Sequence, residues 1–124
     1  MKNIESKINE LIYILRNRPA MWISGDLHAL SSLSSYILFF EGFFSSLEIF
    51  TNLDFERKMA RWYAEKNGTP SNVAWTGQLE MIHTDKTEKE KIAILLDTLE
   101  EFFKENRPIF KQIQKQIQPK TIPT

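Results

Sequence analysis

Carboxylates are the side chains best suited to chemistry in this sequence, and four of them recur at short spacing near its end. They are Glu90, Asp97, Glu100 and Glu101. Within a helix, residues three, four and seven positions apart lie close to one face. Such a face can steer and bind a basic surface of a partner protein. The alternative is an ordinary solvated helix face, because lysines are interleaved with these acids.

A second charged cluster has the opposite sign. Arg57, Lys58 and Arg61 fall on one predicted helix and would suit an acidic partner equally well. The sequence does not decide between the two charged surfaces.

Glu41 is the carboxylate set most deeply among aromatic residues, in the run YILFFEGFFSSLEIF at positions 36–50. Burial there would raise its pKa and make it a candidate general acid. No second carboxylate can be placed beside it from the sequence. We therefore expect Glu41 to reach the surface or to pair with an arginine, and an enzyme built on it is the weaker hypothesis.

Other residue types do not assemble a recognisable catalytic or metal site. Cysteine is absent, and His28 and His83 are far apart in the sequence, whereas zinc sites take three or four ligands at suitable spacing. The serines lie in no Gly-x-Ser-x-Gly elbow, and the glycines form no phosphate-binding loop. We expect no enzymatic activity, no metal and no cofactor.

The composition indicates one globular domain, residues 1–118, with a flexible tail at 119–124. The chain has 124 residues, 42% of them hydrophobic, and its formal net charge is zero. This neutrality argues against direct binding of nucleic acid. The most apolar run is short for a membrane span and contains Glu41 and Glu48, and the first residues lack a signal core. A soluble cytoplasmic protein is expected, with no membrane contact.

Apolar residues at helical spacing predict an all-α fold, an irregular bundle of five or six helices. The segments begin near residues 4, 27, 53, 71, 88 and 109. Pro19 ends the first, Gly68 the third, and Thr87 with Glu90 forms a capping box before the fifth. Residues 27–50 are apolar on nearly all sides, which predicts the central, buried helix. Gly42 costs this helix roughly 1 kcal/mol relative to alanine, and a close helix crossing would offset that cost.

The connection RNRPAMWISGD, at positions 16–26, is unusually apolar for a loop. One hypothesis is that Met21, Trp22 and Ile23 close one end of the bundle. The other is that Trp22 is an exposed anchor for a partner, since tryptophan is favoured at interface hot spots.

Several spaced residues resemble a bacterial family whose members read Arg-Pro-Gly/Ala-Met-Tyr-Ile-Gly before a leucine-rich helix. The matching positions between residues 8 and 103 are Arg18, Pro19, Ala20, Met21, Trp22, Ile23, Gly42, Phe43, Phe55, Trp62, Trp75, Phe102 and Phe103. Trp22 replaces the usual tyrosine, and Ser24 stands where glycine is common. The motif is mostly apolar, so it is informative about fold more than function.

This resemblance implies an immunity protein of a contact-dependent or other polymorphic toxin system. The expected partner is a cognate toxin domain, such as a nuclease, bound in the cytoplasm through Glu90, Asp97, Glu100, Glu101 or Trp22. The alternative is a non-enzymatic helical adaptor or regulatory module. A toxin gene next to this one favours the first. The oligomeric state cannot be read from the sequence.

Overall fold

The computed structural model describes residues 3–17 and 32–117 of the chain. That part consists of helices and their connections, with no strand, and confirms the predicted all-α bundle. The helices are α1 (Ile4–Asn17), α2 (Leu33–Phe50), α3 (Phe55–Asn67), α4 (Trp75–Ile82), α5 (Glu88–Glu105) and α6 (Pro108–Ile117).

Local signals set several helix ends as predicted. Before α5, the N–H of Glu90 donates to the side chain of Thr87 at 3.2 Å, and the N–H of Thr87 donates to Glu90 Oε1 at 3.0 Å. This pair is the predicted capping box. After α3, Gly68 adopts the left-handed conformation, with φ 66°, and its N–H donates to Ala64 O at 2.8 Å. Glycine adopts this conformation without a steric cost.

Other predicted boundaries shift or lie outside the described residues. The fourth helix begins at Trp75 rather than near residue 71, because residues 71–73 form a turn in which the N–H of Val73 donates to Pro70 O. The predicted start of the second helix at 27, the apolar connection with Met21, Trp22 and Ile23, and the tail at 119–124 lie outside the described part.

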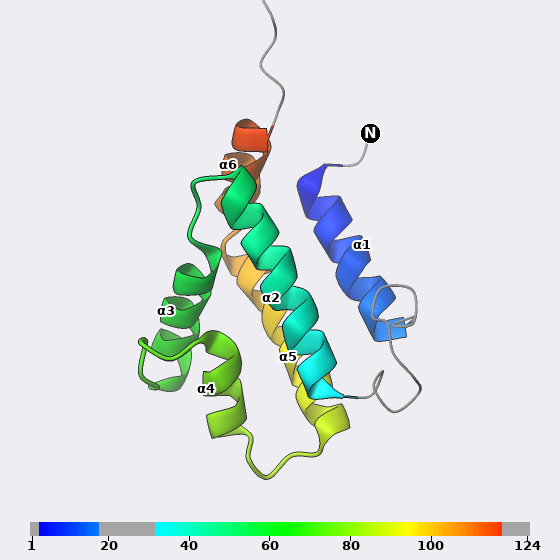
Figure 1. Ribbon diagram of the computed structural model, residues 1–124, viewed down its shortest axis with the longest axis vertical. Coiled ribbons are helices and arrows are strands. Elements are labelled where there is room, and N and C mark those ends of the chain that lie inside the picture. Colours follow the sequence, from blue (N-terminus) through cyan, green and yellow to red (C-terminus); the bar gives the residue numbers. More distant parts are fainter. Residues whose placement is uncertain (1–2, 18–31, 118–124) are drawn as a thin grey trace, which may run out of the picture.

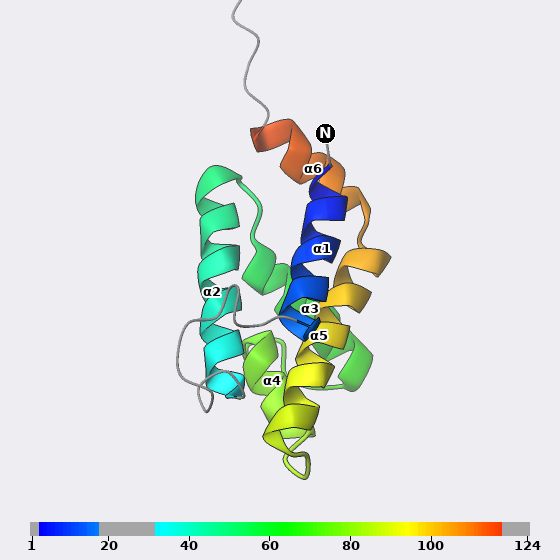
Figure 2. The ribbon, with the colours of Figure 1, turned by 90° about the vertical axis from the view of Figure 1, so that its right-hand side faces the viewer.

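The helices are arranged around α5 (Figure 1). Helices α1, α2 and α4 each pack on α5. Helix α3 contacts α2 and α4, while α6 lies against the start of α1 (Figure 2).

Helix α5 contains more buried residues than α2, which is less buried than the composition of residues 27–50 predicts. Six residues of α5 are buried, against four of the eighteen in α2, namely Leu33, Tyr36, Phe40 and Phe44. The apolar composition of α2 predicted burial on most sides, but in the structure one face of this helix stays in contact with water. Burial depends on which neighbours the rest of the chain supplies.

A cluster of aromatic rings holds the bundle together. Phe44 of α2 stacks on Phe55 of α3 and on Phe103 of α5, with ring centroids 5.8 and 6.3 Å apart. Phe103 stacks in turn on Phe110 of α6 at 5.3 Å. Contacts of this kind add roughly 0.5–1.5 kcal/mol each beyond area burial. Phe55 and Phe103 belong to the resemblance motif, and both act as core residues.

Among the described helices, α2 is the one long and apolar enough to cross a membrane, judged by length and composition alone. About 22% of it is buried inside the bundle. This is weak evidence of a membrane span, because core helices of soluble proteins pass the same test.

Candidate partner-binding surface

Two of the predicted acidic residues converge on one arginine. Arg16, in the last turn of α1, donates from Nη2 to Asp97 Oδ1 at 2.7 Å and from Nε to Glu100 Oε1 at 3.1 Å. Asp97 and Glu100 lie three positions apart on α5, so one guanidinium reaches both. Their side chains remain 69% and 50% exposed. This ion-paired group ties α1 to α5 at the surface.

Glu101 belongs to a separate cluster on the α3 side of α5. Lys66 Nζ donates to Glu101 Oε1 and to Glu105 Oε2, each at 2.6 Å, and lies 5.0 Å from the centre of the Trp62 ring. The Nε1–H of Trp62 also donates to Glu105 at 3.2 Å. Because Lys66 donates hydrogen bonds to Glu101 and Glu105, the pKa of its ammonium group is raised above the ordinary value.

Glu90 is engaged in the capping box before α5. Its bonds with the backbone and hydroxyl of Thr87 lower the pKa of its carboxyl. The structure thus gathers Asp97 and Glu100, but it places Glu101 and Glu90 in other groups. All four are exposed, so a partner-binding role for them stays a prediction. Trp22 lies outside the described residues.

The basic cluster is also at the surface. Arg57, Lys58 and Arg61 are all exposed on α3. The structure therefore leaves both charged surfaces accessible, and exposure does not choose between them.

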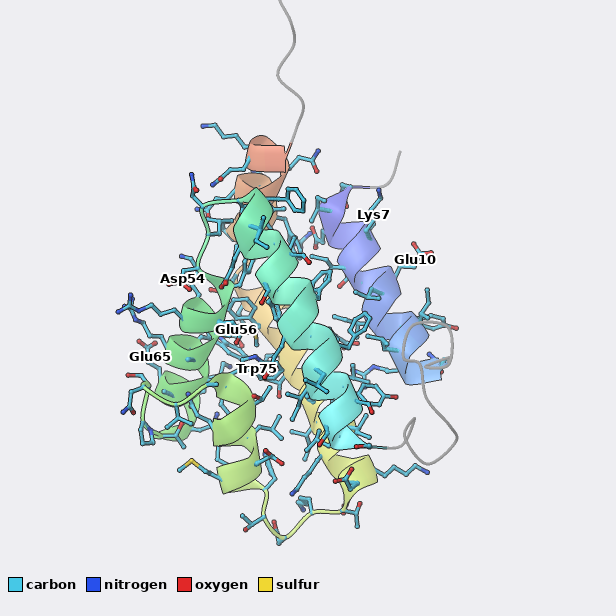
Figure 3. All side chains as sticks on the ribbon, viewed as in Figure 1. Lys7, Glu10, Asp54, Glu56, Glu65 and Trp75 are labelled. Carbon is cyan, nitrogen blue, oxygen red and sulfur yellow. The ribbon has the colours of Figure 1, made fainter. Side chains whose placement is uncertain are left out.

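Glu41 is exposed on α2. The general-acid hypothesis requires a buried carboxyl at this position, so the exposure of Glu41 does not support it. Among the described carboxyls, the one with a raised pKa is that of Glu56, near the start of α3 (Figure 3). Burial raises its pKa to about 7, with further contributions from the negative charges of Glu48, Glu41 and Asp54. Glu48 also accepts a hydrogen bond from the backbone N–H of Glu56 at 3.1 Å.

The sequence analysis did not single out Glu56. The one available signal was the concentration of carboxylates around the connection between the second and third helices. Their mutual approach depends on how α2 and α3 turn back on each other, which residue spacing does not show.

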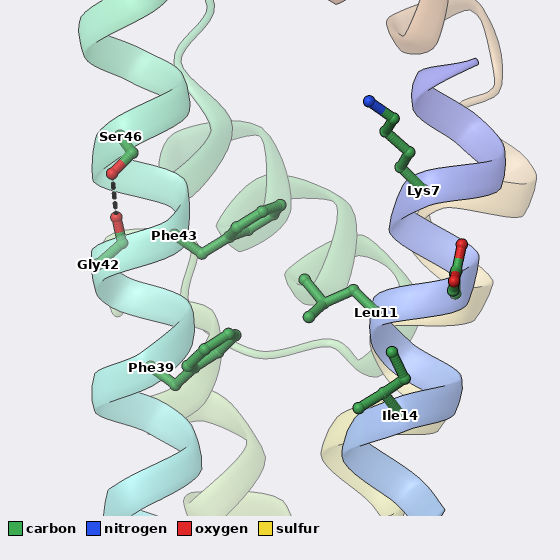
Figure 4. A pocket seen from close by; sticks show the side chains of 8 residues that line it. Lys7, Leu11, Ile14, Phe39, Gly42, Phe43 and Ser46 are labelled. Atoms are coloured by element: carbon green, nitrogen blue, oxygen red, sulfur yellow. Dashed lines mark hydrogen bonds between the residues drawn. The ribbon is translucent and has the colours of Figure 1, made fainter. Parts of the chain in front are cut away.

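An apolar groove of about 510 Å³ lies between α1 and α2. Leu11 and Ile14 project into it from α1, opposite Phe39 and Phe43 of α2 (Figure 4). The remaining lining residues are Lys7, Glu10, Gly42 and Ser46. Both helices pack on α5, and the groove lies in the space between them (Figure 4).

No known family matches this chain. Comparisons with curated proteins and with solved structures give no match either.

Phe39 and Phe43 explain why the groove escaped sequence reasoning. Their spacing of four places them on one side of α2, together with half-buried Leu47, and that side was interpreted as core. Both rings do pack against the core, with Phe40 5.3 Å from Phe39 and 6.4 Å from Phe43. One edge of each ring faces the groove. The groove is open because α1 and α2 are set apart from each other.

The described residues contain no group of three or more histidines, aspartates or glutamates placed to hold a metal ion. The features available to a ligand in that part of the chain include an apolar groove and exposed charged clusters. Ligand pockets of comparable volume, about 300–1,000 Å³, are typically apolar with a few polar groups at their edges.

Proposed function

We propose that this protein is an immunity protein that binds a cognate toxin domain in the cytoplasm and neutralises it. The observation that supports the proposal best is the apolar groove between α1 and α2. The resemblance of the sequence motif to toxin-immunity families supplies the class of partner.

The groove fits a short apolar segment of a protein. Its wall on α1 runs from Lys7 to Ile14, a length of about 10 Å at 1.5 Å rise per residue. That length matches two turns of an amphipathic helix presenting side chains at positions i, i+4 and i+7. The side chains of that partner helix would pack against Leu11, Ile14, Phe39 and Phe43. Aromatic residues such as the two phenylalanines carry most of the affinity in many protein interfaces.

The exposed carboxylates would add charge steering. Arg16 holds Asp97 and Glu100 at the edge of α1, the helix that also forms one wall of the groove. A toxin surface rich in arginine or lysine, as in a nuclease, would be attracted to this edge.

The test is protection of cells that express the toxin encoded by a neighbouring gene. Ile14→Asp places a charge in the groove and should abolish both protection and complex formation. Tyr13→Asp is the matched control, because Tyr13 is 64% exposed on the same helix and does not line the groove. Thermal denaturation of both variants checks that they remain folded.

The proposal fails if the wild-type protein neither protects cells nor co-purifies with the toxin. A helical adaptor is the alternative, and the same groove would serve it. An adaptor would bind an amphipathic helix of a host protein through the Ile14-dependent surface while giving no protection against any neighbouring toxin.

A further inference from the structure

The two walls of the groove between α1 and α2 present their side chains in successive levels, each about one helical turn from the next (Figure 4). Neighbouring lining residues are three or four positions apart on both helices, so each level takes one residue from each wall. The levels are Ile14 with Phe39, Leu11 with Phe43, and Lys7 with Ser46. Two levels are therefore apolar, and the level at one end of the groove is polar.

Lys7 supplies the charge at the polar level. Its side chain is exposed and extends from α1 toward α2 (Figure 4), and it forms no ion pair with the residues that the structure describes. Glu10, the other charged residue of the lining, projects from α1 away from α2 (Figure 3). The hydroxyl of Ser46 donates to Gly42 O at 3.0 Å. The donors available to a ligand at this level are therefore those of the Lys7 ammonium group.

This ammonium group discriminates between segments that enter the groove. A carboxylate placed at the polar level accepts a charge-assisted hydrogen bond from Lys7, whereas a lysine or arginine at the same place is repelled. An apolar side chain there would displace water from the ammonium group without replacing its hydrogen bonds. Specificity between related partners arises from such a combination of attraction and repulsion.

Gly42 leaves space on the α2 side of this end of the groove. A Cβ atom built on it would have nothing within 4 Å, so the close helix crossing expected at this glycine is not made within the described chain. A partner segment can therefore lie close to the backbone of α2 next to Lys7 and Ser46.

From these observations we propose that Lys7 determines partner specificity by pairing with an aspartate or glutamate of the helix that binds in the groove. In that helix two apolar residues, three or four positions apart, pack at the levels of Ile14 and Leu11. The acid lies one turn beyond them, so the three side chains span two turns. The inference rests on the proposed immunity function, because it specifies the toxin segment that the same groove binds.

The two ends of α1 differ in charge, which sets the direction of the bound helix. Lys7 lies near the start of α1, and Arg16 lies in its last turn within a net negative group with Asp97 and Glu100. A helix with an acid near one end and basic residues toward the other is therefore bound in one direction. Attraction of a basic toxin surface and recognition of the acid take place at separate positions.

Calorimetric titration with the toxin domain encoded by the neighbouring gene tests the role of Lys7. Lys7→Glu should weaken the complex at least about tenfold, because two carboxylates would then face each other. Lys7→Gln should weaken it about two- to fivefold, the range for an exposed ion pair, and Lys7→Arg should bind like the wild type. Lys58→Glu makes the same change of charge at an exposed site on α3 outside the groove. It is the control and should leave the affinity unchanged, and thermal denaturation checks that each variant is folded.

A carbodiimide cross-link identifies the acid. The reagent joins a carboxylate to an amine in direct contact with it, so Lys7 should be linked to one aspartate or glutamate of the toxin, located by mass spectrometry of the digested complex. Two apolar residues should lie within two helical turns of the linked acid. Its replacement by lysine should restore binding to Lys7→Glu. Lys7→Arg should bind the toxin without forming the link, because a guanidinium group does not react.

The outcomes separate this inference from the function on which it rests. A wild type that does not bind the toxin contradicts the immunity function itself. If the wild type binds, Ile14→Asp abolishes binding and Lys7→Glu binds as tightly as the wild type, the groove is the binding site and the contact between Lys7 and an acid is refuted. Weakening by Lys58→Glu in place of Lys7→Glu refutes the contact as well, because it assigns the partner to the basic cluster of α3.

Discussion

The side-chain amide of Gln78 on α4 donates a hydrogen bond to the backbone oxygen of Ala60 on α3, with 3.0 Å between the two atoms. Its Nε2 also donates to Val73 O at 2.8 Å, and its Oε1 accepts from the hydroxyl of Thr69. Gln78 is 0% exposed. One buried amide thus joins α3, α4 and the turn between them, with its polar atoms satisfied.

Replacement of Gln78 by leucine should therefore destabilise the protein more than most polar substitutions. The change leaves two buried carbonyls and the Thr69 hydroxyl without this partner, and we expect a loss of about 2–3 kcal/mol in the free energy of unfolding. Urea denaturation measures it. Glu80→Ala, at an exposed position of the same helix, is the control and should change stability by less than about 0.5 kcal/mol. Equal stability of the two variants would contradict this account.

Local rules predicted the features that depend on a few neighbouring residues. The capping box at Thr87 and Glu90 and the helix end at Gly68 both follow from side-chain chemistry within four positions. The fold class follows from the spacing of apolar residues along each segment. These features can be predicted without knowing how distant segments of the chain pack together.

The parts that could not be predicted depend on distant segments. Arg16 and Asp97 are 81 positions apart, so no spacing indicates their ion pair. The composition of α2 indicates that apolar surface must be covered, but it does not say whether this chain covers it. The groove beside Phe39 and Phe43 and the exposure of Leu38 depend on how distant helices pack, which the composition does not show.

The stability of the protein should fall between about pH 4.5 and pH 7 because of Glu56. Its pKa is raised to about 7 in the folded chain, from a reference value of 4.5, so the folded state holds this proton more tightly than the unfolded state. Protonation therefore stabilises the fold, and the contribution is lost as pH rises through this window. Since solvent screens a half-buried carboxyl, we expect roughly 1 kcal/mol.

Glu56→Gln removes this dependence and should be more stable than the wild type at pH 8, with little difference at pH 4. Thermal unfolding measured at both pH values provides the check, with Glu65→Gln, an exposed site on the same helix, as the control. A larger gain at pH 4 than at pH 8 would rule out the raised pKa as the cause.

Two glycines should respond to alanine in opposite directions. Gly42→Ala should raise the free energy of unfolding by up to about 1 kcal/mol, because the site is helical and open to a Cβ. Gly68→Ala should lower it by about 1 kcal/mol, because a φ of 66° strains a residue with a side chain. Chemical denaturation measures both changes. A gain at both sites would show that Gly68 is not needed for the left-handed cap.

Substitution of Arg16 distinguishes a structural role of Asp97 and Glu100 from a role of these acids in binding a partner. Arg16→Gln breaks the tie between α1 and α5, and an exposed pair of this kind should cost less than about 1 kcal/mol of stability. The same change leaves Asp97 and Glu100 without their counter-charge. If these acids steer a basic toxin, its association rate with Arg16→Gln should exceed that with the wild type and should fall steeply with added salt.

The double variant Asp97→Asn/Glu100→Gln should associate with the toxin more slowly than the wild type. Stopped-flow binding at two salt concentrations measures both effects, and identical rates for all three proteins would leave the acids with a structural role alone.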